Sequence, residues 1–187
     1  MEETSKQLIG EAVPPLPAAP GQPERFDYAY VRNGTANLCM LFAPLQGWRA
    51  VRVTARRTAQ DFAEVVRWRV EARYPDAEQG GRGADNLNTH TPAALYTVFA
   101  PEQARRIADR IEWHDTPKHG SGLNMAEIEL SVLFRPCLDR RIDAQAELER
   151  VVATWEAKRN ARGGVAQWRF TAADARIKLR RLYPSLQ

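Results

Sequence analysis

Apolar positions recur along this chain with two different spacings, which predict strands in some segments and helices in others. Residues 36–42 are mostly apolar, and residues 48–54 alternate apolar with basic side chains, so each segment is predicted to be a strand. Pro44 and Gly47 lie between them and favour a tight turn, which predicts an antiparallel hairpin. Residues 1–8 are predicted to be the tail of a further strand.

Helical spacing begins after the hairpin. The apolar residues of 58–74 repeat every three to four positions, Thr58 stands where an N-cap residue is expected, and Pro75 ends the segment. Residues 14–23 are rich in proline, alanine and glycine, which predicts an irregular loop. A strand is predicted over 111–116, and further helices over 92–99, 101–110, 124–134, 144–159 and 172–182. Pro136 is expected to stop the helix that begins at 124.

One acidic side chain stands at a point of special chemical interest. Asp85 follows the glycine-rich segment 79–84, where glycine and the cost of burying Arg82 predict a very short strand. In α/β folds, an aspartate between a strand end and a helix is placed where metal or phosphate is handled. Glu127 lies in a second polar segment, at 116–130. We expect these two carboxylates to meet over one site.

Composition places few further limits on function. A length of 187 residues suits one domain with a real core, and the chain has no apolar run long enough for a membrane, so a cytoplasmic protein is expected. Cys39 and Cys137 are far apart and lack zinc-site spacing, so both are expected to be packed small hydrophobic residues. The net charge of +4 is compatible with a polyanionic partner.

The two polar segments resemble a known family. D-N-L-N-T-H-T-P at 85–92 and T-P-K-H-G-S-G-L-N-M-A-E-I-E-L at 116–130 are similar to the DDE transposases of bacterial insertion sequences, in the IS-six-thirty branch related to mariner elements. The resemblance extends over 3–8, 30–38, 137–141 and 168–179. It implies an α/β, ribonuclease-H-like fold with a mixed central sheet flanked by helices. It further implies a catalytic core over 1–138 and a C-terminal helical extension of the same domain over 139–187.

The resemblance also implies a chemistry. DDE enzymes cleave DNA and transfer its strands with two Mg²⁺ or Mn²⁺ ions held by three acidic side chains. Asp85 matches the second acidic position, Glu127 the third, and Glu2 stands where the family has the first, an aspartate. Helical spacing predicts that Glu127 lies on the face of its helix turned towards the sheet and that Glu129 points away from it.

DNA is the expected partner, in a nucleoid-associated homodimer on paired ends. Residues expected to contact phosphates are Arg56, Arg57, Lys118, His119, Lys178, Arg180 and Arg181. A solvated loop or basic face is the alternative for several of them. His90 either orients Asp85 or contacts a phosphate, or else it is a capping or packing residue.

Two functional classes remain open from the sequence. The helix-turn-helix that precedes this catalytic domain in the family is not seen, so a C-terminal fragment of a transposase is expected. It is either a metal-dependent strand-transfer enzyme or a non-catalytic DNA-binding or subunit-interaction remnant.

Overall fold

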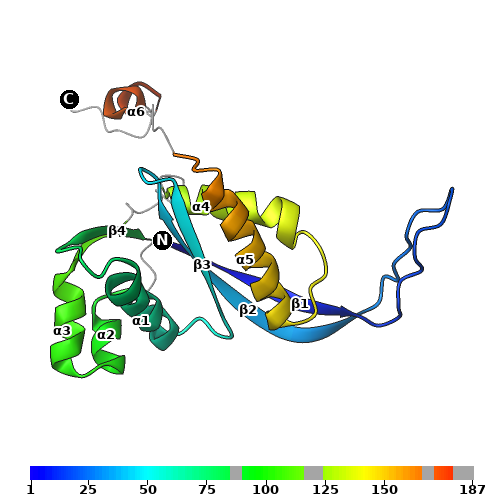
Figure 1. Ribbon diagram of the computed structural model, residues 1–187, viewed down its shortest axis with the longest axis horizontal. Helices are drawn as coiled ribbons and strands as arrows, with labels where there is room; N and C mark the ends of the chain where they lie inside the picture. The colour runs from blue at the N-terminus through cyan, green and yellow to red at the C-terminus, as the bar shows by residue number, and fades with distance from the viewer. Residues whose placement is uncertain (85–89, 116–123, 166–170, 179–187) are drawn as a thin grey trace, which may run out of the picture.

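The computed structural model describes residues 1–84, 90–115, 124–165 and 171–178. Its described strands form an antiparallel sheet of order β1-β2-β3 and a separate parallel pair, β4-β5 (Figure 1). The bounds of these strands are β1 Glu2–Glu11, β2 Tyr30–Ala43, β3 Trp48–Thr54, β4 Gly80–Ala84 and β5 Ile111–Asp115. The hairpin predicted around Pro44 and Gly47 is confirmed as β2–β3.

The expectation of one mixed central sheet is not met among these strands. β1 approaches β4 only at its first residue, where the amino group of Met1 donates to the carbonyl of Gly83 over 2.7 Å. A single hydrogen bond does not make a ladder, so the two sheets stay distinct. β4 itself is only five residues long, which confirms the short strand predicted from its glycines.

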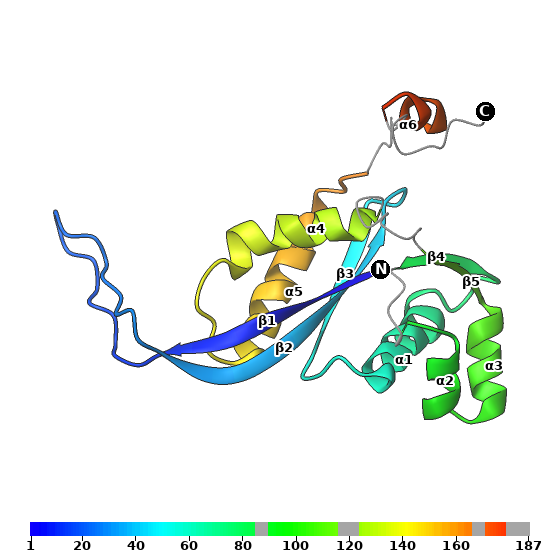
Figure 2. The same ribbon diagram turned by 180° about the vertical axis from the view of Figure 1, so that it is seen from behind.

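Helices cover both sheets (Figures 1 and 2). The described helices are α1 Ala59–Trp68, α2 Ala93–Val98, α3 Pro101–Asp109, α4 Met125–Leu133, α5 Gln145–Ala161 and α6 Ala172–Lys178. Thr58 caps α1 as predicted, and Asp61 returns a hydrogen bond to the Thr58 backbone, so the cap is reciprocal. The prediction that Pro136 stops the helix is wrong, because α4 ends before it and the helical path continues beyond it. The chain passes the proline in a wider turn, Phe134–Leu138, closed by a hydrogen bond from the Asp139 amide to the Phe134 carbonyl.

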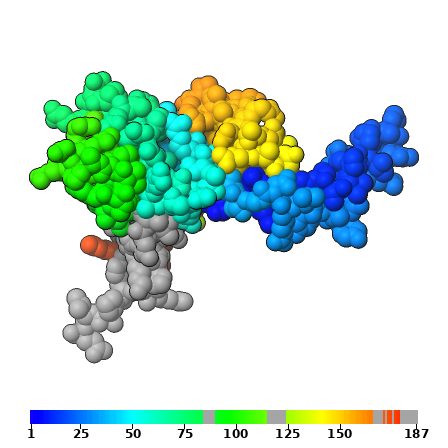
Figure 3. Space-filling model, turned by 90° about the horizontal axis from the view of Figure 1, so that it is seen from below, coloured from blue at the N-terminus to red at the C-terminus, as the bar shows by residue number. Residues whose placement is uncertain are grey.

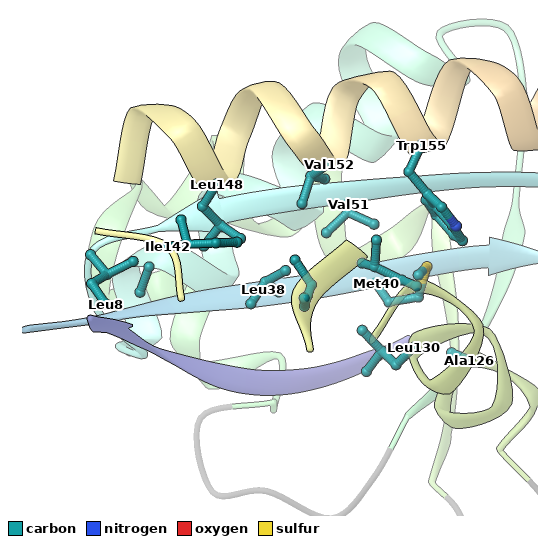
Figure 4. Packing of buried hydrophobic residues seen from close by; sticks show 13 residues of the cluster. Leu8, Leu38, Met40, Val51, Ala126, Leu130, Ile142, Leu148, Val152 and Trp155 are labelled. Atoms are coloured by element: carbon teal, nitrogen blue, oxygen red, sulfur yellow. The ribbon is translucent and has the colours of Figure 1, made fainter. Parts of the chain in front are cut away.

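The antiparallel sheet packs against α4 and α5 over one apolar core (Figure 4). The apolar stripe of α5, with Leu148, Val152 and Trp155, faces Leu38 and Val51 of the sheet. Leu38 and Leu148 are fully buried. These residues repeat at helical spacing, and the helix predicted over 144–159 is confirmed as α5.

The parallel pair packs with α1, α2 and α3 around a second core. Phe62 of α1 is fully buried in this core, together with Leu95 of α2, Ile107 of α3 and Ile111 of β5. Arg82 of β4 is also buried, with its guanidinium 4.9 Å from the Phe62 ring centre and 4.8 Å from that of Trp113. Aromatic faces attract a cation, which offsets part of the cost of burying it.

A long arm joins β1 to β2 and projects from the body of the molecule (Figure 3). The segment predicted as irregular is held by two isolated bridges, Leu16 with Arg25 and Ala19 with Gln22. Arg141 secures the base of the arm by donating to the carbonyls of Asp27 and Ala29. The arm therefore extends the sheet beyond the core rather than adding to it.

Candidate functional site

Glu2 is held at the start of α4 by an asparagine. The Asn124 side-chain amide donates to the Glu2 carboxylate over 2.6 Å and to the Met1 carbonyl over 3.0 Å. The side-chain oxygen Oδ1 of Asn124 accepts from the Ala126 amide at 3.2 Å and so caps α4. One buried side chain thereby joins β1 to the helix that carries Glu127. The sequence reasoning assigned no role to Asn124, although an asparagine before an apolar helix is an N-cap signal.

The end of β4 lies beside the same point. The Met1 amino group bonds to the carbonyl of Gly83, two positions before Asp85. Asp85 itself lies outside the described residues. The structure thus brings together the start of β1, the end of β4 and the start of α4, which are the elements that carry or directly precede the three expected carboxylates.

The orientation predicted for Glu127 and Glu129 on α4 is wrong. Glu127 is exposed, whereas Glu129 is only 5 % exposed. The Glu129 carboxylate accepts from Arg159 of α5 over 2.7 Å and forms an ion pair with the fully buried Arg49 of β3 at 3.0 Å. Two cations therefore stabilise Glu129 on the buried side of the helix, a compensation that helical spacing alone cannot show.

The predicted helix over 124–134 includes Phe134, but α4 ends at Leu133. Phe134 belongs to the wider turn after α4, where a spacing of 3.6 residues no longer holds. The residues that α4 buries in the core are Ala126, Leu130 and Leu133. The exposure of Glu127 leaves its carboxylate accessible from solvent.

A second buried carboxylate, Glu3, faces the helices on the other side of β1. It accepts from the Arg57 guanidinium at 2.8 Å and lies 3.3 Å from the His90 ring nitrogen Nε2. Burial alone would raise the pKa of Glu3, but the hydrogen bonds and charges of His90 and Arg57 outweigh it and lower that pKa.

These contacts place two of the residues singled out from the sequence. His90 is 2 % exposed and stacks on Phe62 with ring centres 4.8 Å apart, so its ring is packed within the protein. Arg57 pairs with Glu3 at 2.8 Å while its side chain stays 37 % exposed. Whether His90 also orients Asp85 stays a prediction, because Asp85 lies outside the described residues.

The other expected phosphate contacts are only partly described. Arg56 is exposed in the loop before α1, and Lys178 is exposed at the end of α6, which stands apart from the two sheets (Figures 1 and 2). The remaining ones lie outside the described residues: Lys118, His119, Arg180 and Arg181. Of this set, the described residues Arg56 and Lys178 therefore lie on separate elements of the chain.

The donors near the start of α4 suit a hard divalent cation. Glu2 and Glu127 offer carboxylate oxygens, which are the ligands that Mg²⁺ and Mn²⁺ prefer. Among the described residues, no group of three histidine, cysteine, aspartate or glutamate side chains could hold a metal ion. The expected third ligand, Asp85, lies outside that part of the chain.

Comparison with known protein families agrees with this arrangement. The family model described as DDE superfamily endonuclease matches residues 1–149. The chain belongs to the DDE superfamily endonucleases. The match spans both sheets and α4, so every element of the candidate site in this DDE endonuclease lies within it.

Two further comparisons found nothing. No curated protein and no solved structure matches the chain. Within the described residues, no helix is both long and apolar enough to cross a membrane.

Proposed function

We propose that this DDE endonuclease is the catalytic domain of an insertion-sequence transposase of the IS-six-thirty branch, which cleaves DNA and transfers its strands with divalent metal ions. The observation that carries the proposal is the double role of Asn124. Its amide holds the Glu2 carboxylate at 2.6 Å, and its carbonyl oxygen caps the helix that bears Glu127. Residues far apart in the chain are thereby brought to one point.

Asp85, Glu127 and Glu2 would hold two Mg²⁺ or Mn²⁺ ions when DNA is bound. Such ions lower the pKa of an attacking water or 3′-hydroxyl and stabilise the departing oxygen. Glu127 lies in the first turn of α4, where the helix dipole favours a negative charge. Glu2 is one methylene longer than an aspartate, so the bond from Asn124 fixes a carboxylate that would otherwise sample several rotamers.

The proposed architecture is a ribonuclease-H-like core over 1–138 with a C-terminal helical extension over 139–187. In support, α5 of the extension places Leu148, Val152 and Trp155 in the same apolar cluster as β1, β2 and α4, so the two parts share one core. Arg56 and Lys178, with the other basic residues expected from the sequence, would contact DNA phosphates. We further propose a cytoplasmic, nucleoid-associated homodimer as the working assembly.

Cleavage of labelled DNA that carries the ends of the element tests the proposal. Asp85→Asn and Glu127→Gln should each lower the metal-dependent rate by more than about 10²-fold, because each removes a charged metal ligand. Glu102→Gln is the matched control. Glu102 is exposed on α3, one of the helices around the parallel strand pair, so this variant should keep the full rate. Equal rates in all of these proteins would contradict the assignment of the site.

A second candidate is a non-catalytic DNA-binding or subunit-interaction protein. The observation that favours it is Glu2 itself, because a carboxylate displaced by about 1 Å can cost about 10²-fold in rate. In that case the folded protein binds DNA without cleaving it in Mg²⁺ or Mn²⁺. Glu2→Asp, which shortens the side chain to that of the family, should then restore cleavage.

A further inference from the structure

A groove of about 520 Å³, here called the α5 groove, lies between α5 and the turn that follows α4. Its cationic lining residues are Arg140, Arg150, Lys158, Arg159 and Arg162. The others are Val132, Pro136, Cys137, Val151, Thr154 and Trp155. Most of the cations are exposed, whereas Val132, Cys137, Val151 and Trp155 are half-buried or buried, so the rim is positive and the floor apolar. Among the described residues that line the groove, none carries a carboxylate.

Three of the cations form a row along one face of α5. Arg150, Lys158 and Arg162 are separated by eight and then four residues, which places them on the same side of a helix. Arg162 follows the last residue of α5 in a helical conformation, so the row continues to the end of the helix. Twelve residues at a rise of about 1.5 Å each make the row about 18 Å long. One strand of duplex DNA presents a phosphate about every 3.4 Å along its axis, so the row can follow about five phosphates.

The charge of this row is only partly neutralised within the protein. Arg140 and Arg150 share one carboxylate, that of Glu147, at 3.1 and 2.8 Å. These two arginines therefore carry one positive charge more than their partner. Within the part of the chain that the structure describes, Lys158 and Arg162 form no ion pair, and both side chains are exposed.

The helix dipole accounts for only some of these cations. Lys158 and Arg159 lie in the last turn of α5, where the dipole favours positive charge. Arg150 lies in the first half of the helix and Arg140 precedes it, so the dipole does not favour a cation at either position. What the cations share is instead the groove that they line.

The groove leads toward the candidate site. Arg159, near the end of α5, donates to Glu129 of α4 over 2.7 Å, whereas Val151 lines the groove together with Cys137, which lies beyond α4. The helix α5 therefore runs back along α4, and its end lies nearer the start of α4 than its beginning does (Figures 1 and 2). A duplex laid along the row thus extends toward the end of α4 where the candidate carboxylates are expected.

We propose that the α5 groove binds duplex DNA, with Arg150, Lys158 and Arg162 in contact with successive phosphates of one strand. The inference rests on the proposed function in one respect, that DNA is the substrate. Phosphate contacts fix the position of a duplex without reading its sequence, so the groove holds DNA that flanks the cleaved bond. None of these three residues belongs to the basic set expected from the sequence.

Binding of a labelled duplex of random sequence, measured by fluorescence anisotropy without divalent metal, tests the row directly. Lys158→Gln with Arg162→Gln should lower affinity by at least about tenfold and reduce the salt dependence by about two phosphate contacts. Arg25→Gln with Arg105→Gln is the matched control, because it removes the same charge from exposed side chains on the arm and α3. The control should change affinity by less than about twofold.

Cys137 reports on the groove itself. Its side chain is partly exposed there, whereas Cys39, the other cysteine, is 1 % exposed. The uncharged reagent N-ethylmaleimide should therefore modify Cys137 first. Bound duplex should slow this reaction by at least about fivefold, because it covers the groove and access limits thiol reactivity. The protein with both Lys158→Gln and Arg162→Gln should lose this protection.

Neither measurement needs metal, so this inference and the proposed catalysis can fail separately. Equal affinities in the double variant and its control, or labelling of Cys137 that DNA does not slow, would overturn the inference even in a protein that cleaves DNA. Loss of binding and protection in the double variant alone would support it even where no protein cleaves. Protection of Cys137 by poly-glutamate but not by DNA would assign the groove to an acidic polypeptide and overturn DNA as its ligand.

Discussion

The two halves of the molecule, the antiparallel sheet with its helices and the parallel pair with its helices, each bury an arginine among different neighbours. In the antiparallel half, Arg49 is fully buried, pairs with Glu129 at 3.0 Å and donates to the Gly47 carbonyl over 2.8 Å. In the parallel half, Arg82 is 4 % exposed and lies against the rings of Phe62 and Trp113. The contacts described for Arg49 thus include a carboxylate, and those described for Arg82 include two aromatic rings, so substitution of each partner tests a different half.

The largest effect is expected for Glu129→Ala. This change removes the carboxylate that faces Arg49, and breaking a buried pair from one side typically costs about 3–5 kcal/mol because the other charge stays buried. Urea unfolding followed by circular dichroism measures the loss of unfolding free energy. Glu127→Ala, two positions away and exposed, should cost less than about 0.5 kcal/mol. Similar losses for both substitutions would mean that the ion pair does not stabilise this half.

A smaller effect is expected in the parallel half for Phe62→Leu. The change leaves a cavity in the second core and removes the ring that contacts both Arg82 and His90, which together should cost about 2 kcal/mol. The same urea measurement applies. Phe26→Leu on the exposed arm is the matched control and should be nearly neutral, because Phe26 is 57 % exposed. A loss in Phe62→Leu no greater than in this control would refute the role of the ring.

The smallest effect is a dependence of stability on pH. It comes from the Met1 amino group, which bonds to the Gly83 carbonyl where the two halves meet. The pKa of the Met1 amino group falls from 8.0 in the unfolded chain to about 6 in the fold, chiefly through burial. Between those values the unfolded chain binds more protons, so stability should rise as pH increases from 6 to 8. Because Met1 as a whole is only half-buried, we expect a gain of about 1 kcal/mol.

Unfolding midpoints at pH 6 and pH 8 measure this gain, with a protein acetylated at Met1 as the control. Acetylation removes the titrating amino group, so the part of the stability difference between pH 6 and pH 8 that is due to Met1 should disappear. Glu3 acts in the same direction at lower pH: its pKa is lowered by His90 and Arg57 despite its burial, so its contribution is present above about 4.5 and is lost as the pH falls further. A pH dependence between 6 and 8 that survives acetylation would exclude Met1 as its source.

Much of the local structure could be predicted from the sequence. The hairpin of β2 and β3, the cap of α1 at Thr58, the start of α3 at Pro101 and the helix α5 all follow from short-range spacing, and all are confirmed. The resemblance to DDE enzymes also agrees with the family match over 1–149. The roles of Asp85, Glu127 and Glu2 stay predictions.

The errors arose where distant residues decide the outcome. Glu129 could be buried only because Arg49 and Arg159, which lie 80 positions before it and 30 positions after it, neutralise its charge. The single mixed sheet was expected from the family resemblance, whereas sheet continuity depends on how many hydrogen bonds β1 and β4 exchange. The role of Asn124 was missed because a cap signal does not reveal which strand lies beside the helix.

The sequence by itself determined the order of strands and helices, most of their bounds and the family, because hydrophobic spacing, capping residues and motifs act over a few neighbouring positions. Only the tertiary structure decided which glutamate of α4 is exposed, that Arg57 pairs with Glu3, and that Asn124 joins β1 to α4. These features depend on burial and on contacts between residues far apart in the chain, and neither is encoded in local spacing.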